Sequence, residues 1–208
     1  MKTFKVVLKL VSELRATKPP ANVNLAKRHA EAMRGRILQV LRSKKETASE
    51  KELEKELKKW LESTLNVFPR KEYNGVGQIA FPNTWIMGVL EERSSALKLS
   101  KINRKVIKNG LMIRPRLIGL RRNGKPLADT VIVEDTVVSN DIHGRRVAIK
   151  HFEAVMPPAY TETIYINVYT PLISGESLRK LLEYGRLGAS RGQGCGEFKL
   201  AYFEEVKE

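Results

Sequence analysis

Cysteine is nearly absent from this chain of 208 residues, which contains only Cys195. One thiol excludes an intrachain disulfide and a zinc site built from several cysteines. Long apolar runs are absent too. The sequence has no stretch of about 18 apolar residues, which is the length that a membrane-spanning helix needs, so a membrane span is excluded. Lys5 and Lys9 interrupt the apolar N-terminal stretch, unlike the continuous apolar core of a secretory signal. We therefore expect a cytoplasmic protein with no membrane partner.

The sequence also lacks a recognisable metal-binding motif. Four acidic residues lie close together, but without the spacing typical of cation ligands; they are Asp129, Glu134, Asp135 and Asp141. Cys195 has no histidine that the sequence identifies as its partner, so we do not expect a nucleophile there. We predict no metal site and no cofactor.

Acidic residues are few compared with basic ones. The chain has 23 Asp and Glu against 38 Lys and Arg, which gives a net charge of +15. A positive field of this kind attracts polyanions and speeds their encounter with the protein. The charge therefore favours a nucleic acid or another acidic partner.

The imbalance is strongest between residues 93 and 125, where no Asp or Glu occurs. This basic segment contains eleven cations: Arg93, Lys98, Lys101, Arg104, Lys105, Lys108, Arg114, Arg116, Arg121, Arg122 and Lys125. Cations bind phosphate backbones because binding releases condensed counterions. The pattern predicts nucleic-acid contact, and the competing interpretation is a solvated face that keeps the protein soluble.

Two helices are predicted after the N-terminal strand. Apolar residues recur with helical spacing over residues 24–43 and again over 50–65. Ser49 and Glu52 form a capping-box pattern at the start of the second helix. We expect these two helices to form a helical hairpin.

The middle of the chain predicts further helices and short strands. Asn83 could cap a helix over 84–98, and a second helix over 99–109 would end at Gly110. Short apolar runs follow and are typical of strands: 111–113, 117–120 and 130–138.

The last third has a clearer pattern. Residues 145–155 and 161–170 predict two strands joined by a proline-rich loop. Ser174 is expected to cap a helix that stops at Gly185, and residues 198–206 predict a final strand.

The order of these elements indicates the fold class. Alternating apolar residues over 3–11 predict a half-buried strand. Together with an early helix and the last third, it gives the order β-α-β-β-α-β, which ferredoxin-like and RNA-recognition domains share. We therefore predict an α+β, ferredoxin-like (RRM-like) fold in a single domain of residues 1–208. The helical hairpin (24–65) and a large basic insertion (83–144) would lie within it.

Five glycines fall between the predicted last helix and strand, in residues 185–196. Glycine lets backbone N–H groups approach phosphate, and Arg186 and Arg191 would add charge. The loop is neither a Walker motif nor a dinucleotide fingerprint, because its flanking elements and residues differ. A helix C-cap explains Gly185 but not the other four, so we predict nucleic-acid contact at Gly188, Gly192, Gly194 and Gly196.

Two tyrosines are candidates for base stacking. Tyr165 and Tyr169 alternate with apolar residues of the predicted strand over 161–170, so they would stand on its open side. The other aromatic residues of the last strands are expected to belong to the core.

The three histidines are candidates for acid–base chemistry on RNA. His143 precedes two arginines that could stabilise a phosphate transition state, whereas His29 lies on the apolar side of its predicted helix. A structural role is the competing interpretation for both residues and for His151. The sequence does not establish that the protein is an enzyme.

The run Leu181–Phe198 resembles the signature of the RAMP superfamily of CRISPR-associated proteins. In that family a helix and a glycine-rich loop precede the last strand of a ferredoxin-like fold. The segment Gly110–Pro115 is similar to a Gly-Leu-x-Ile-x-Pro segment of small RAMP-like proteins from phages and archaeal elements. The resemblance covers roughly residues 80–206 and does not include the helical hairpin.

The resemblance implies binding of RNA or of an RNA–DNA hybrid. Members serve as guide-RNA backbone subunits, as guide-RNA-processing ribonucleases or as phage proteins. It also implies His29 as the counterpart of a histidine that processing ribonucleases use. However, the sequence predicts one ferredoxin-like core where most such ribonucleases have two, which weighs against that role.

We predict an RNA-binding protein that acts as a RAMP-like subunit of a ribonucleoprotein complex. RNA and other subunits would be its partners, and an RNA–DNA hybrid or single-stranded DNA remain open as ligands. Two alternatives also remain open. One is a metal-independent endoribonuclease that processes guide RNA, and the other is a structural assembly subunit of a phage or archaeal element.

Overall fold

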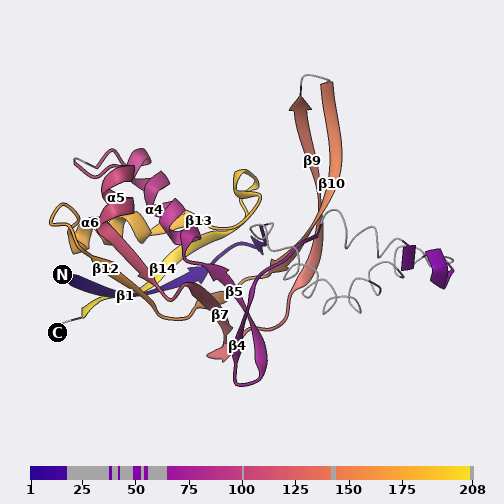
Figure 1. Cartoon of the computed structure of the whole chain (residues 1–208), viewed down its shortest axis with the longest axis horizontal. Coiled ribbons are helices and arrows are strands. Elements are labelled where there is room, and N and C mark those ends of the chain that lie inside the picture. Colours follow the sequence, from indigo (N-terminus) through magenta and orange to yellow (C-terminus); the bar gives the residue numbers. More distant parts are fainter. Residues whose placement is uncertain are drawn as a thin grey trace. The chain divides into compact units, whose positions relative to one another are not determined.

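The computed structural model describes residues 1–17, 38, 42, 49–52, 54–55, 65–99, 101–141 and 144–206. The chain divides into two compact units, which we describe separately. The first comprises Met1–Arg15, Pro69–Asp129 and Val155–Glu208, and the second comprises Ala16–Phe68 and Thr130–Ala154. Figure 1 shows the course of the chain.

One antiparallel sheet is the frame of the first unit. Ten strands of its described residues take part: β1 (Lys2–Leu10), β4 (Arg70–Tyr73), β5 (Val76–Pro82), β6 (Leu111–Arg114), β7 (Leu117–Arg122), β8 (Lys125–Pro126), β11 (Ala159–Thr161), β12 (Ile164–Val168), β13 (Tyr184–Arg186) and β14 (Glu197–Val206). The strands follow the order β13-β14-β1-β11-β7-β5-β4. In addition, β12 pairs with β1 and β6, and β8 pairs with β7. The short strand β2 (Leu14–Arg15) follows β1 in the chain.

The strand β1 confirms the alternation that the sequence predicts. Its even-numbered apolar residues are buried, and the residues between them are half-buried. The buried set is Phe4, Val6, Leu8 and Leu10. Period-two alternation is the signature of a strand with two different faces, so β1 defines an apolar face and a more polar face of the sheet.

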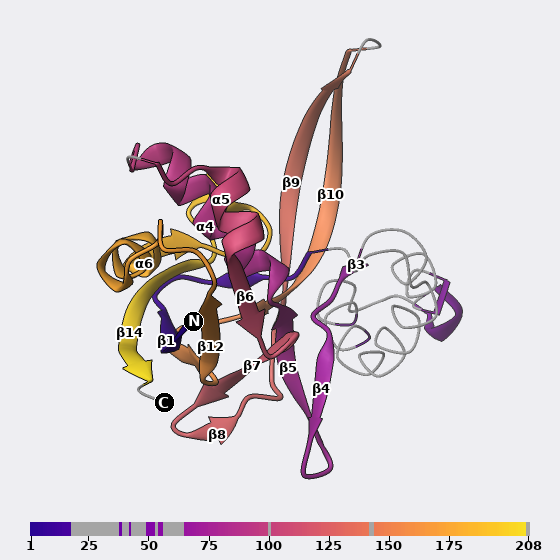
Figure 2. The same cartoon turned by 60° about the vertical axis from the view of Figure 1, so that its left-hand side comes forward.

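Three α-helices lie within the described residues of this unit: α4 (Thr84–Ala96), α5 (Arg104–Gly110) and α6 (Gly175–Leu182). Figure 2 shows them gathered on one side of β1, β12 and β14. Apolar residues of all three are buried, including Leu90, Ile107 and Leu178. The helices therefore cover the apolar face of the sheet. Among the described residues, no helix is long and apolar enough to cross a membrane.

The helix ends agree with the sequence in part. The Ser174 hydroxyl accepts a hydrogen bond from the Ser177 N–H at 3.1 Å, which confirms its predicted capping role. Asn83 occupies the predicted N-cap position before Thr84, but its side chain makes no cap hydrogen bond, because its amide donates to the Ile113 carbonyl at 2.6 Å instead. The cap of α5 is Asn103, which accepts from the Val106 N–H at 3.0 Å.

The first and last strands lie side by side in the middle of this sheet. The strand order across the centre is β14-β1-β12-β6, and every pairing is antiparallel. In the chain, α4 and α5 lie between β1 and β6, and α6 lies between β12 and β14. The protein is therefore α+β, and the described helices of the first unit lie on one face of its antiparallel sheet.

The second unit contains a long hairpin. Its strands are β9 (Val131–Asp141) and β10 (Gly144–Val155), paired over eleven residue positions. The strand β3 (Leu65–Asn66) pairs with β10 in parallel. The predicted hairpin between 145–155 and 161–170 is therefore wrong. Pro157 and Pro158 lack the N–H groups that a continued ladder needs, whereas β10 pairs with β9 from Gly144 opposite Asp141 onward.

Most of the predicted helical hairpin lies outside the described residues, including the helix over 24–43 apart from residues 38 and 42. The start of the second helix is described. The Ser49 N–H donates to the Glu52 carboxylate at 3.0 Å, and the Glu52 N–H donates to the Ser49 carbonyl at 3.0 Å. The capping box is thus confirmed in part: the Glu52 carboxylate caps the Ser49 N–H, whereas the Ser49 hydroxyl bonds that carboxylate at 2.9 Å and not the Glu52 N–H.

A buried carboxylate connects three segments of the second unit. Glu153 is fully buried on β10. Its carboxylate accepts hydrogen bonds from the Phe68 N–H at 2.8 Å and from the Thr130 hydroxyl at 2.6 Å. Its backbone carbonyl accepts from the Ala16 N–H at 2.9 Å.

Replacing this carboxylate tests how the second unit is held together. We expect Glu153→Ala to lower the free energy of unfolding by roughly 1–3 kcal/mol, because the buried Phe68 N–H loses its acceptor. Hydrogen exchange at Phe68 and urea denaturation measure the effect. The exposed Glu72→Ala is the control for loss of a charge, and equal stability of the two variants would contradict the prediction.

Candidate nucleic-acid interface

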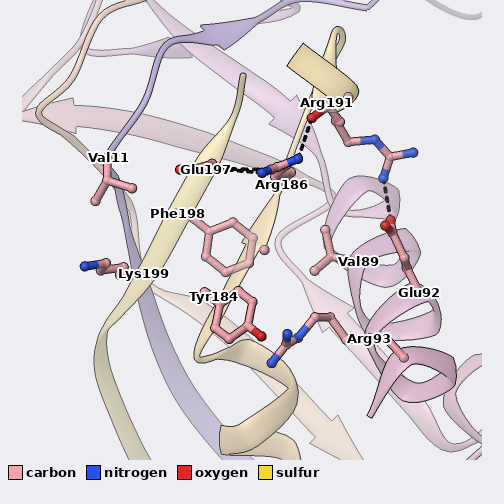
Figure 3. Close-up of a pocket in the computed structure, with 13 residues that line it drawn as sticks. Val11, Val89, Glu92, Arg93, Tyr184, Arg186, Arg191, Glu197, Phe198 and Lys199 are labelled. Carbon is pink, nitrogen blue, oxygen red and sulfur yellow. Dashed lines mark hydrogen bonds and ion pairs between the residues drawn. The ribbon is translucent and has the colours of Figure 1, made fainter. Parts of the chain in front are cut away.

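A groove of about 840 Å³ lies in the first unit, between α4, β13, β14 and the loop over residues 187–196 (Figure 3). Arg93 of α4 lies over the ring of Tyr184 at 3.7 Å from its centroid. Arg93 is only 8% exposed, and its Nη2 donates to the Lys180 carbonyl at 3.1 Å. Its buried Nε has no hydrogen-bond partner among the described residues. Arg93 is thus held in place by the fold, unlike a solvated surface arginine.

Two ion pairs occupy the rim of this groove. Arg186 contacts the Glu197 carboxylate at 2.8 Å, and Arg191 contacts Glu92 of α4 at 2.9 Å. Arg186 also donates to the Arg191 carbonyl at 2.9 Å. Both predicted loop arginines therefore have carboxylate partners, which reduces the charge that they offer to a phosphate. Because these pairs are exposed, each stabilises the fold only slightly.

Close packing accounts for two of the loop glycines. Gly188 and Gly196 both have φ of +75°. A Cβ at Gly188 would overlap the Arg15 carbonyl oxygen, and one at Gly196 would overlap the Leu187 carbonyl oxygen. Gly194 also has a positive φ, of +83°, whereas a Cβ at Gly192 would meet open space. The fold requires glycine at three of these positions but not at Gly192.

Several backbone amides of the loop are already bonded within the fold. The Ala189 N–H donates to the Arg15 carbonyl at 3.0 Å, and the Gly196 N–H donates to the Glu13 carbonyl at 2.6 Å. The Leu187 N–H donates to the Gly196 carbonyl at 2.9 Å. The first two bonds attach the loop to the segment that follows β1, and the third closes the loop on itself. The glycine pattern therefore has a structural cause in addition to any role in binding.

The cations of the basic segment differ from the two loop arginines in that they have no carboxylate partners among the described residues. The eleven cations are spread over α4, α5, β6, β7, β8 and the connections between them. Within the described residues, none of the eleven forms an ion pair with a carboxylate. Three donate instead to neutral oxygens. Arg93 bonds Lys180, Arg114 bonds the Asn167 amide at 3.5 Å, and Arg122 bonds the Pro158 carbonyl at 3.1 Å. Since these oxygens are neutral, no described carboxylate compensates the positive charge of any of the eleven residues.

Both tyrosines predicted to stack bases are exposed. Tyr165 of β12 lies opposite Lys5 of β1 and opposite Arg114 of β6. Tyr169 follows β12, and its hydroxyl contacts the sulfur of Met112 at 3.7 Å. Opposed residues of antiparallel strands project from the same face, so Tyr165 and two cations share the face that the helices leave uncovered.

A second set of residues on this face was missed from the sequence. Lys199 of β14 lies opposite Lys9 of β1, Lys9 lies opposite Tyr160 of β11, and Tyr160 lies opposite Arg121 of β7. The ammonium of Lys9 is 5.7 Å from the Tyr160 ring centroid. The alternation of β1 signals that Lys9 faces away from the core, but the pairing of distant strands has no local signal in the sequence.

The histidine hypothesis is not tested by the described residues. His29 and His143 lie outside them, and His151 lies on β10 opposite Glu134. Cys195 is buried. Within the described ranges, no three His, Cys, Asp or Glu side chains gather in a way that could hold a metal ion.

Comparison with known proteins shows weak structural likeness and no match in sequence. No protein-family model matches the sequence, and no curated protein matches it. Among solved structures, a chain in the cryo-EM structure of the Type III-B Cmr-beta bound to cognate target RNA is similar, at 12% identity and a TM-score of 0.49. The match covers 99% of this chain and 61% of that chain. Because the likeness is this low, the function must be argued from the residues of this chain.

The loop geometry predicts different outcomes for two neighbouring glycines. We expect Gly196→Ala to lower the free energy of unfolding by more than about 1 kcal/mol, because a side chain there is strained at positive φ and overlaps Leu187. Gly192→Ala should leave stability unchanged, because its Cβ enters open space. Chemical denaturation of both variants is the measurement, and similar losses in the two would contradict this explanation of the loop.

Proposed function

We propose that this protein binds RNA mainly through the sugar–phosphate backbone, as a RAMP-like subunit of a ribonucleoprotein complex. The observation that carries the proposal is the basic segment, whose eleven cations form no ion pair with any described carboxylate. Uncompensated cations repel one another and destabilise the compact state. A polyanion relieves that repulsion and releases counterions when it binds.

The positions of these cations support a surface rather than a single pocket. Lys98, Lys101, Arg104, Lys105 and Lys108 are all exposed on α5 and the turn before it. Arg114 and Arg121 lie instead on strands of the sheet. Contacts from several elements suit an extended backbone better than a compact anion.

A ferredoxin-like core is part of the proposal. The strand order β14-β1-β12-β6 places the last strand beside the first, the third beside the first and the second at the edge. The helix pair α4 and α5 and the helix α6 lie at the two crossover positions. RNA-recognition domains use this arrangement to present an open sheet face with exposed aromatic residues. Tyr160 and Tyr165 are such residues here.

Salt dependence tests backbone binding directly. We expect affinity for a short unstructured RNA to fall by roughly 300-fold to 10⁴-fold between about 50 and 200 mM salt if six to ten phosphates of a single strand are engaged. On a single strand, the double variant Lys101→Gln/Lys105→Gln should reduce the log–log slope by about 0.7 for each phosphate that is no longer neutralised. Fluorescence anisotropy at several salt concentrations measures both quantities.

A matched variant controls for the change in net charge. Lys2 and Lys180 are ion-paired with Glu205 and Glu176 at 3.1 and 2.7 Å. The double variant Lys2→Gln/Lys180→Gln removes the same formal charge from sites that already have partners. Its slope should match that of the unaltered protein. A flat salt response of the unaltered protein, or equal slopes for the two double variants, would overturn the proposal.

A further inference from the structure

Five residues form a row that crosses the sheet of the first unit from strand to strand. Tyr184 lies opposite Lys199, Lys199 opposite Lys9, Lys9 opposite Tyr160, and Tyr160 opposite Arg121. Neighbouring strands lie about 4.8 Å apart, so the five positions span about 19 Å at right angles to the strands. We call these residues the cross-strand row. It contains three cations and two aromatic rings, and no acidic residue.

The first end of the row is a fixed aromatic platform. Tyr184 and Lys199 both line the groove beside α4 (Figure 3). Arg93 covers one side of the Tyr184 ring at 3.7 Å, yet Tyr184 remains 55% exposed. The ring therefore keeps surface available to a ligand in the groove. Because Arg93 is buried and bonded to Lys180, the ring has a firm support, and less side-chain entropy is lost when a base stacks on it.

The other end of the cross-strand row also combines an exposed tyrosine with a lysine and an arginine. Tyr160 is 36% exposed, with the Lys9 ammonium near its ring and Arg121 as its neighbour on β7. The guanidinium of Arg121 lies 5.6 Å from the ring centroid of Tyr73. Its buried Nε, like that of Arg93, has no hydrogen-bond partner among the described residues.

We propose that the cross-strand row binds a single strand of RNA, with bases stacked on Tyr184 and Tyr160 and the intervening phosphates contacted by Lys199 and Lys9. This inference depends on the proposed RNA-binding function and adds the class of RNA. The bases of a duplex are stacked on one another and present only their edges, whereas the unpaired bases of a single strand can stack on aromatic side chains. The row therefore selects single-stranded RNA over duplex RNA.

The neighbouring positions on the same face supply a contrast. Glu204 lies opposite Lys5, and Tyr202 donates a hydrogen bond to Glu204. That hydrogen bond raises the pKa of Tyr202, so the hydroxyl stays protonated and attached to a carboxylate. A phosphate would be repelled there. Tyr202 is thus an exposed tyrosine of the same sheet that lies outside the cross-strand row, which makes it a matched control.

The test compares three tyrosines in a binding assay. A short unstructured RNA is presented either as a single strand or annealed to its complement, and anisotropy gives the dissociation constants. We expect Tyr184→Ala and Tyr160→Ala each to weaken single-strand binding by roughly five- to 150-fold, the range for loss of one stacked base. Tyr184→Phe and Tyr160→Phe should retain binding, because stacking needs the ring and not the hydroxyl. Tyr202→Ala should bind as the unaltered protein does.

A second measurement does not depend on how the variants fold. Single-stranded RNA that contains 5-iodouridine is photocrosslinked to the unaltered protein, and the modified residues are mapped by mass spectrometry. We expect crosslinks at Tyr184 and Tyr160. Crosslinks confined to Tyr165, Tyr169 or Tyr202 would overturn binding along the cross-strand row.

The remaining outcomes separate this inference from the proposed function. If the unaltered protein binds RNA with steep salt dependence while both alanine variants bind equally well, the role of the cross-strand row is wrong and backbone binding stands. That role is also wrong if the alanine variants lose duplex binding as strongly as single-strand binding. If the unaltered protein binds no RNA, both proposals fail.

Discussion

The first unit depends on the hydrogen bonding of β1. This one strand pairs with β14 on one side and with β12 and then β11 on the other, so it joins segments from both ends of the chain. Its alternation sends Phe4, Val6 and Leu8 to the helices and Lys5 and Lys9 to the opposite face. A shift of one residue in its pairing would exchange these two sets, and the core would then contain lysines. The register that builds the core therefore also creates the cationic face.

The charge of this protein is distributed in two different ways. Around the glycine-rich loop, Arg186 and Arg191 have carboxylate partners that contribute to the local structure. Along the basic segment no such partner occurs among the described residues, although the chain has 23 acidic residues available. A fold that needed these cations for its own stability would pair them. Cations that remain unpaired cost stability through mutual repulsion, and binding to an anion offsets that cost.

Local patterns predict local features of this chain well. The alternation of β1, the capping by Ser174 and the bond from the Ser49 N–H to the Glu52 carboxylate depend on residues within a few positions of one another, and the structure has all three. Predictions of which distant segments pair with one another were less accurate. The strand over 145–155 pairs with β9 over eleven positions, and no local property of 161–170 excludes that segment as the partner. The candidate site shows the same division: the basic segment is visible in the sequence, but Lys9, Tyr160 and Lys199 become neighbours only through the register of the sheet.

The glycine-rich loop and the aromatic platform are connected through one residue. A Cβ at Gly185 would lie 2.6 Å from Val89 of α4 and 2.8 Å from the ring of Phe198, so only glycine lets α4 pack this closely against β13. Arg93 lies one helical turn after Val89 on the same side of α4. The close approach at Gly185 thus brings the Arg93 guanidinium to the ring of Tyr184, the residue just before Gly185. A larger residue at 185 would push the helix away and leave Tyr184 without its support. Gly185 would therefore affect RNA binding through the position of Tyr184, although it presents no group of its own to the ligand.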